Sequence, residues 1–141
     1  MADCVRLSYL VDGDNFVSAG SATESVKSAL KGMGVNPSDV RRVAISMYEG
    51  EINMVIHANG GHAYADIYVD KCVITLIDTG KGIPDIELAM KPGYSTASEE
   101  VRSLGFGAGM GLPNIKTYSD RLKIDTEVGV GTTLTIEIDF D

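Results

Sequence analysis

The sequence predicts an α+β two-layer sandwich, in which helices pack on one face of a mixed, mostly antiparallel sheet. Three observations lead to this fold class. Two helical segments follow the first strand, two pairs of strands are each joined by a short turn, and a long glycine-rich segment lies between the pairs. Short turns join antiparallel neighbours, and this order of elements places the helices on one face of the sheet. The 141 residues are expected to form a single domain, 1–141.

The first strand and the first helix have clear local signals. The strand-like run VRLSYLV covers residues 5–11, and the turn sequence DGDN follows it. SATESVKSALKGMG begins at Ser21, carries Glu24 three residues later and ends in glycines. A capping box with a glycine stop predicts a helix over residues 22–32.

A second helix is expected at about residues 37–58, ended by NGG. On a helical projection with Glu49 at zero, Asn53 and His57 fall at roughly 40° and 80°, so the three form one polar ribbon. Glu51 falls at roughly 200° and is expected to be a surface charge. Gly50 leaves room either for close packing or for an incoming substrate loop. The apolar stripe is expected at Ala44, Ile45, Tyr48, Ile52, Val55 and Ile56.

The remaining elements are predicted from the alternation of hydrophobic and polar residues and from residues that interrupt helices and strands. HAYADIYVD and KCVITLID predict an antiparallel hairpin around residues 70–71, and LKIDTEV and TTLTIEIDF predict a second hairpin around the turn GVG. PNIKTYSDRL predicts one short helix. Between them, residues of about 80–110 are rich in glycine, proline and serine. A loop of this length in a compact domain is usually functional, and we expect it to be the lid of a site.

Composition excludes some classes of partner. Twelve basic residues against twenty acidic ones give a net charge of −8, which argues against nucleic acid or an anionic membrane as partner. Cys4 and Cys72 are too far apart for a CxxC motif, and Cys72 is expected to be a buried, reduced thiol. Neither a signal peptide nor 18 consecutive apolar residues are present, so a cytoplasmic protein is expected.

The polar ribbon suits metal-assisted chemistry. A carboxylate and a carboxamide one turn apart fit a hydrated Mg²⁺ site beside an activated hydroxyl. Asn53 would supply a hard oxygen ligand, and Glu49 would act as a base or orient a nucleophile. An exposed polar margin explains the same pattern, and a lone histidine such as His57 is more often structural.

The stretch VITLIDTGKGI ends an apolar strand at Asp78 and continues with Gly80 and Gly82. An aspartate there can accept a hydrogen bond from an exocyclic amine, and the glycines let the backbone approach a flat ring. The end of an ordinary hairpin strand, where Asp and Gly are common, is the alternative explanation of this stretch. GVGTTLTIEI could place a threonine hydroxyl near this aspartate, although a hairpin turn fully explains it.

The third motif, GFGAGMGLPNI, has alternating glycines directly before a helix. Such glycines expose successive backbone N–H groups, and the helix N-terminus adds positive potential, so a polyphosphate fits. The sequence matches neither a P-loop nor a G-x-G-x-x-G fingerprint. A mobile linker would not run straight into LPNI.

Together the motifs resemble a known superfamily. E-x-x-x-N-x-x-x-H-A, then D-x-G-x-G, then G-x-G-x-G-x-G before a helix, then G-T-T is the order found in the GHKL superfamily of ATPases and kinases, with its Bergerat ATP-binding fold. The resemblance covers residues of about 20–138. Within it, GAGMGLPNIKTYSDRLKIDTEVGVGTTLTI is similar to the anti-sigma-factor serine/threonine kinases of bacterial partner-switching systems, in particular to stressosome-type switch kinases.

The resemblance implies a role for each matched residue. Glu49 would be the catalytic base, Asn53 would bind Mg²⁺, Asp78 would bind the adenine amine, and residues of about 85–108 would form the ATP lid. Either Thr132 or Thr133 would support the ring-binding aspartate. The implied positions for ATP are Asn53, His57, Asp78, Gly80, Gly82, Ile83, Gly105, Gly107, Ala108, Gly109, Met110, Gly111, Leu112, Thr132 and Thr133.

A glutamate at position 49 suits a hydroxyl or water nucleophile, whereas histidine kinases usually carry a non-acidic residue there. The resemblance therefore implies phosphoryl transfer from Mg·ATP to a serine or threonine of a regulatory protein partner, antagonist-like or sigma-factor-like, with a homodimer as one implied assembly. A nucleotide-gated binding module and a simple ATPase are the alternatives. The basic residue that precedes the second glycine box in many such kinases is missing, and Lys81, Lys91, Arg102 and Lys116 remain candidates to neutralise the phosphates.

Overall fold

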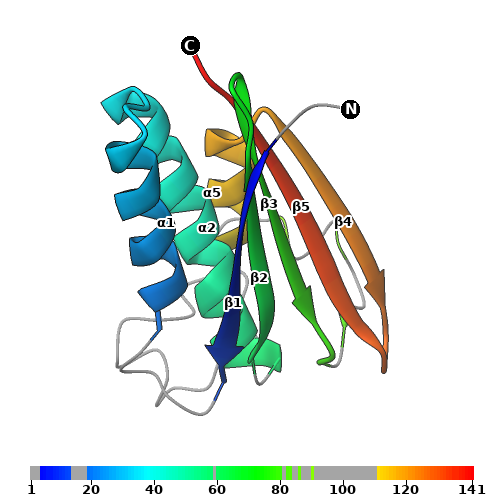
Figure 1. Ribbon diagram of the computed structural model, residues 1–141. Coiled ribbons are helices and arrows are strands. Elements are labelled where there is room, and N and C mark those ends of the chain that lie inside the picture. The colour runs from blue at the N-terminus through cyan, green and yellow to red at the C-terminus, as the bar shows by residue number, and fades with distance from the viewer. Residues whose placement is uncertain are drawn as a thin grey trace, which may run out of the picture.

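The computed structural model describes residues 4–13, 19–58, 60–80, 82–83, 86, 90 and 111–141. Most of the expected lid, about 80–110, therefore lies outside the described residues. The elements are, in chain order, β1 (Val5–Asp12), α1 (Ser21–Gly32), α2 (Pro37–Ala58), β2 (Gly60–Ile67), β3 (Lys71–Asp78), α5 (Gly111–Tyr118), β4 (Arg121–Glu127) and β5 (Gly131–Asp139). All three of these helices lie on one side of the sheet (Figure 1), which confirms the expected two-layer α+β fold.

The sheet has the strand order β1-β2-β3-β5-β4, and each neighbouring pair is antiparallel. Among the described strands there is no parallel pair, so the sheet is more uniform than the expected mixed one. The central pairing of β3 with β5 sets Asp78 opposite Thr132. This register places Asp78 of the stretch VITLIDTGKGI beside Thr132 of the stretch GVGTTLTIEI.

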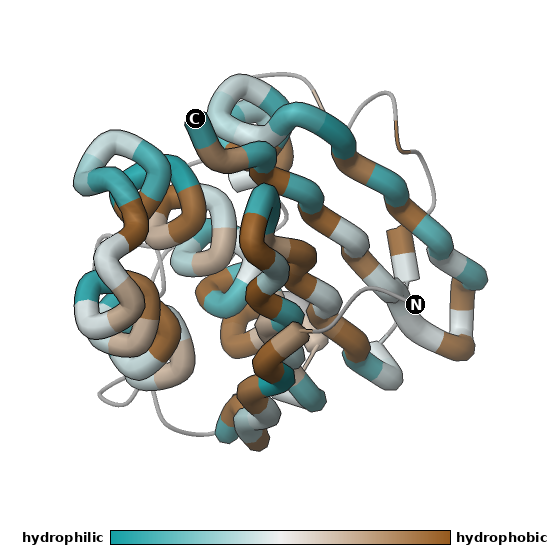
Figure 2. The backbone as a smooth tube through the Cα atoms, turned by 45° about the horizontal axis from the view of Figure 1, so that its top comes forward, coloured by the Kyte–Doolittle hydropathy of each residue, from teal (hydrophilic) through white to brown (hydrophobic). Residues whose placement is uncertain are grey.

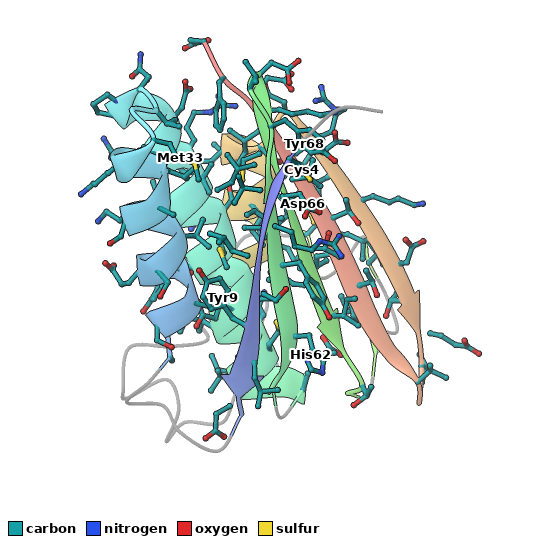
Figure 3. All side chains as sticks on the ribbon, in the orientation of Figure 1. Cys4, Tyr9, Met33, His62, Asp66 and Tyr68 are labelled. Carbon is teal, nitrogen blue, oxygen red and sulfur yellow. The ribbon has the colours of Figure 1, made fainter. Side chains whose placement is uncertain are left out.

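Hydrophobic and hydrophilic residues alternate along β4 and β5 (Figure 2), and buried positions alternate with half-buried ones along β5. Tyr9 points toward the helices, whereas His62 and Asp66 lie on the opposite face (Figure 3). Cys72 faces the helices and is fully buried as a free thiol, as expected. Burial raises the pKa of this thiol to about 12, because the thiolate would lose its hydration.

Helix α2 buries only part of the expected stripe. Ile52 and Val55 are buried as expected, whereas Tyr48 is 40% exposed, and Met47 and Met54 are buried although they lie outside the stripe. The expectation was incomplete because α2 contacts α1, α5 and the sheet together, so no single apolar arc determines its buried face. Gly50 belongs to this contact surface: a Cβ there would overlap Cδ1 of Leu76 in β3. Close packing therefore accounts for the glycine.

Glu51 is not a surface charge, contrary to expectation. Its side chain is 1% exposed and accepts hydrogen bonds at the start of α1. Oε2 accepts from the Gly20 and Ala22 amides at 2.9 and 3.3 Å, and Oε1 accepts from the Thr23 amide and hydroxyl at 3.0 and 2.7 Å. The expected capping box is absent, because α1 has Gly20 at its N-cap and no side-chain cap of its own. A carboxylate from α2 takes over that role.

Helix α5 is shorter at its C-terminal end than the predicted segment PNIKTYSDRL. It ends at Tyr118, and Arg121 already pairs with Glu137 of β5. Strand pairing therefore overrides the helical pattern over the last residues. Within the described part of the chain, no helix has the length and hydrophobicity that crossing a membrane would require.

Candidate active site

Helix α5 lies along the polar ribbon of α2. A Cβ added at Gly111 would come within 2.8 Å of Nδ2 of Asn53, and Nδ2 of Asn114 donates to Oε1 of Glu49 at 3.4 Å. At the other end, Nε of Arg42 donates to the Tyr118 carbonyl at 3.2 Å. Positions 42, 49 and 53 fall within roughly 40° of one another on α2. Helix α5 therefore packs along this side of α2, and the two helices run in opposite directions.

This packing sets the N-terminus of α5 beside Asn53. The first amides of a helix have no intrahelical partner and carry positive potential, so they favour an anion. Leu112 is itself 7% exposed, so its side chain belongs to the core and its backbone N–H is the group that can contribute to binding. A phosphate there would be in reach of both the helix amides and the Asn53 carboxamide.

Asp78 forms the second half of the site. Its Oδ1 accepts hydrogen bonds from the Gly80 amide at 3.0 Å and from the Thr132 amide at 3.1 Å. Among the described residues no hydrogen bond to Oδ2 is seen, so this oxygen can accept from an exocyclic amine. Fixing one carboxylate oxygen with two backbone donors orients the other.

The structure distinguishes the two candidate threonines. Thr132 is 8% exposed and lies on the helix-covered face with Leu134 and Ile136, whereas Thr133 lies on the opposite face. Oγ1 of Thr132 lies 2.9 Å from Oγ1 of Thr126. Thr132 is therefore the threonine that supports Asp78.

Thr126 was not singled out from the sequence. Its hydroxyl accepts from the Ile83 amide at 2.8 Å and bridges to Thr132, so it ties the chain after Asp78 to the final hairpin. The signal that would have found it is the hairpin register, because Thr126 pairs directly with Thr132.

The glycines after Asp78 allow close backbone contacts. A Cβ at Gly80 would lie 2.7 Å from Cα of Ala58, the last residue of α2. Gly82 has φ of 78° and its Cβ would lie 2.6 Å from the Glu127 carbonyl, a combination that only glycine tolerates. These contacts hold the Asp78 half against the end of α2, so both halves border one site.

Other predicted positions lie outside the described residues. These are Gly105, Gly107, Ala108, Gly109 and Met110, together with the side chain of His57. Asn114 was not singled out either, although its place three residues after the last glycine of the motif was a usable signal. Across the described residues, no three His, Cys, Asp or Glu side chains gather at metal-binding distances.

Comparisons with known proteins identify the family to which the chain belongs. The family described as histidine kinase-, DNA gyrase B- and HSP90-like ATPase matches residues 23–141. An anti-sigma F factor from Caldanaerobacter subterraneus subsp. tengcongensis is 34% identical over 99 residues, which are 67% of this chain and 66% of that protein. The chain thus spans just under two thirds of that relative's length.

Two further similarities extend over more of the chain. The serine/threonine-protein kinase RsbT of Bacillus subtilis is 27% identical over 118 residues, 81% of this chain and 83% of that protein. A mycobacterial sensor histidine kinase, MprB, superposes with a TM-score of 0.53 at 15% identity, covering 96% of this chain and 98% of that one. The last similarity concerns the fold alone.

Proposed function

The chain belongs to the family of histidine kinase-, DNA gyrase B- and HSP90-like ATPases, and from this premise we propose that it is an ATP-dependent serine/threonine protein kinase of the anti-sigma regulatory type. Its substrate would be a serine or threonine on a small regulatory protein, antagonist-like or sigma-factor-like. The relatives named anti-sigma F factor and serine/threonine-protein kinase support this assignment.

One observation supports the proposal: α5 begins beside Asn53 and contacts Glu49, while the backbone after Asp78 packs on Ala58 at the end of the same helix, α2. The contacts of Gly111 with Asn53 and of Asn114 with Glu49 define one side of the proposed site. A nucleotide lying between this side and Asp78 would meet a carboxylate at its base and amides at its phosphates. Oδ2 of Asp78 would accept from the adenine amine, while the Thr132 amide holds Oδ1.

The residues present also fit Mg²⁺. Mg²⁺ keeps several waters and is usually bound by one or two protein oxygens together with substrate phosphates. Asn53 offers a carboxamide oxygen at the mouth of the phosphate site, where Gly111 leaves room that a side chain would fill. When bound, the ion would neutralise charge on the transferring phosphoryl group.

The role of Glu49 follows from its chemistry. The attacking hydroxyl oxygen bonds to the γ-phosphorus, the bond to the β–γ bridging oxygen breaks, and ADP leaves. Glu49 accepts the hydroxyl proton in this step. Because such transfer depends mainly on positioning and charge neutralisation, the packing of α5 along α2 is a suitable frame for it.

Transfer of label tests this function. The chain is incubated with γ-labelled Mg·ATP and with the proteins that co-purify with it in ATP or in ADP. Label is expected to move to a serine or threonine of a partner, and Glu49→Ala should reduce that transfer by roughly 100-fold or more while ATP binding persists.

The matched control is Glu24→Ala, which removes an exposed carboxylate from the first turn of α1. This variant should transfer label as the wild type does. Glu51→Ala is unsuitable, since Glu51 is a buried cap. Tight ATP binding without transfer to any partner would contradict the kinase, and phosphate release that no partner alters would indicate a simple ATPase.

A further inference from the structure

Asn114 contacts the proposed base from the neighbouring helix. It lies in the first turn of α5, half-buried, and its Nδ2 donates to Oε1 of Glu49 at 3.4 Å. Among the residues that the structure describes, this is the one side-chain hydrogen bond to Glu49. We propose that Asn114 is a positioning residue, whose amide holds the Glu49 carboxylate toward the substrate hydroxyl. This inference rests on the proposed function.

The chemical type of the donor fits such a role. A carboxamide is neutral, so it can orient a carboxylate without forming the ion pair that a lysine or arginine would form. The separation of 3.4 Å is long for a hydrogen bond. Catalytic hydrogen bonds are often long before substrate binds and shorten in the reacting complex, which suits a contact that orients the base without immobilising it.

The position of Asn114 also links the base to the nucleotide. Gly111 and Leu112 offer the amides proposed for phosphate binding, and Asn114 follows them in the same turn of α5. The other end of α5 is held through the Tyr118 carbonyl by Arg42. One helix, anchored at both ends on α2, therefore sets the phosphates and the Glu49 carboxylate in a fixed relation.

Two substitutions separate this role from simple packing. Asn114→Leu preserves the approximate shape of the side chain but removes its donors, whereas Asn114→Ala removes both. If the amide positions Glu49, both variants should lower kcat for label transfer by roughly 10- to 100-fold, with the Kd for Mg·ATP changed less than about twofold. An Asn114→Leu variant with wild-type kcat would overturn the proposal.

The control on the same helix is Thr117→Ala, which removes an exposed hydroxyl that donates to the Pro113 carbonyl at 2.9 Å. It should leave kcat unchanged. In a Glu49→Ala background, Asn114→Ala should cause no further loss, since a positioning residue has no effect without the group it positions. A further tenfold loss in that background would contradict the proposal.

An NMR measurement separates failure of this inference from failure of the kinase assignment. The side-chain amide resonances of Asn114 should move in Glu49→Ala and stay in place in Glu24→Ala. If the wild type transfers no label while these resonances move, the proposed function fails and the contact remains. If they do not move, the positioning role fails whatever the activity.

Discussion

At the scale of single residues, the two oxygens of Asp78 have different tasks. Oδ1 is used by the Gly80 and Thr132 amides, which hold the end of β3 against the start of β5. Oδ2 has no partner among the described residues and is the oxygen we assign to the adenine amine. In the proposed function, the same side chain organises the backbone and would also offer an acceptor to ATP.

Asp78→Asn tests this division. The new side chain can keep its carbonyl oxygen toward the two amides, but its NH₂ group would then replace Oδ2 and face the adenine amine, donor against donor. We expect the Kd for ATP to rise by at least roughly 100-fold, with little change in the free energy of unfolding without ATP. Isothermal titration and urea denaturation measure the two quantities.

Thr133→Val is the matched control, since that threonine lies on the face away from the site. It should bind ATP as the wild type does. Unchanged ATP binding in Asp78→Asn would remove the adenine assignment, whereas a large loss of stability would show that the side chain acts mainly on the backbone.

At the scale of elements, the pair α1 and α2 is joined by a buried charge. Glu51 takes four hydrogen bonds from the start of α1, where the amides would otherwise have no partner. The negative charge also lies at the positive end of the helix dipole. Two positions away along α2, Glu49 reaches α5 instead. Neighbouring glutamates of one helix therefore hold two different elements.

Glu51→Gln should lower the free energy of unfolding by about 2–3 kcal/mol, because both oxygens of Glu51 accept and the new NH₂ group would face backbone donors. For a domain of this size that is a fall in Tm of roughly 5–10 °C. Urea and thermal denaturation measure it. The exposed Glu24→Gln should change stability by less than about 0.5 kcal/mol. Equal stability of both variants would contradict the capping role.

The elements differ in how far the sequence determines them. Local patterns were enough for residues 5–11, 22–32, 37–58 and 71–78, since alternation, breakers and helix length are properties of short segments. The buried face of α2 was not predictable in this way, because elements contact it on several sides. Glu51 was misassigned for the same reason: its partners lie 28 to 31 residues away.

At the scale of the whole molecule, the order of the motifs was enough to propose the candidate site in outline. The motif order alone identified Glu49, Asn53 and Asp78, without any knowledge of tertiary contacts. Choosing Thr132 over Thr133 required the register of β3 with β5, and finding Asn114 required the path of α5 along α2. Long-range packing decides both, and no single segment of the sequence contains that information.

Arg42 shows how distant parts of the chain are held together. Its guanidinium donates to the Tyr118 carbonyl at 3.2 Å, to the Asp139 carbonyl at 3.2 Å and to Oδ2 of Asp120 at 2.7 Å. It also lies 3.5 Å from the buried Asp39 carboxylate. This one side chain connects α2, the end of α5 and the end of β5, at the end of the molecule opposite the site.

Asp120 makes this junction sensitive to pH. The Asp139 amide and the Arg42 guanidinium both donate to its carboxylate and hold its pKa below the ordinary value of 3.8. A carboxyl group whose pKa is lower in the folded state stabilises the fold above its unfolded-state pKa, and loses that contribution as pH falls through the folded-state value. The stabilisation by Asp120 should therefore be complete at neutral pH and vanish in strong acid.

Asp120→Asn measures this contribution, since the amide can still accept from the Asp139 N–H but carries no charge for Arg42. Because the Asp120 side chain is 35% exposed, we expect the variant to be less stable than the wild type by no more than about 1 kcal/mol near pH 7. The difference should shrink as pH falls below the ordinary pKa of 3.8 and disappear in strong acid. Urea denaturation across this range measures it, with Asp70→Asn in the exposed β2–β3 turn as the control. A difference that stayed constant down to strong acid would show that shape at position 120, and not charge, holds the end of α5 to the sheet.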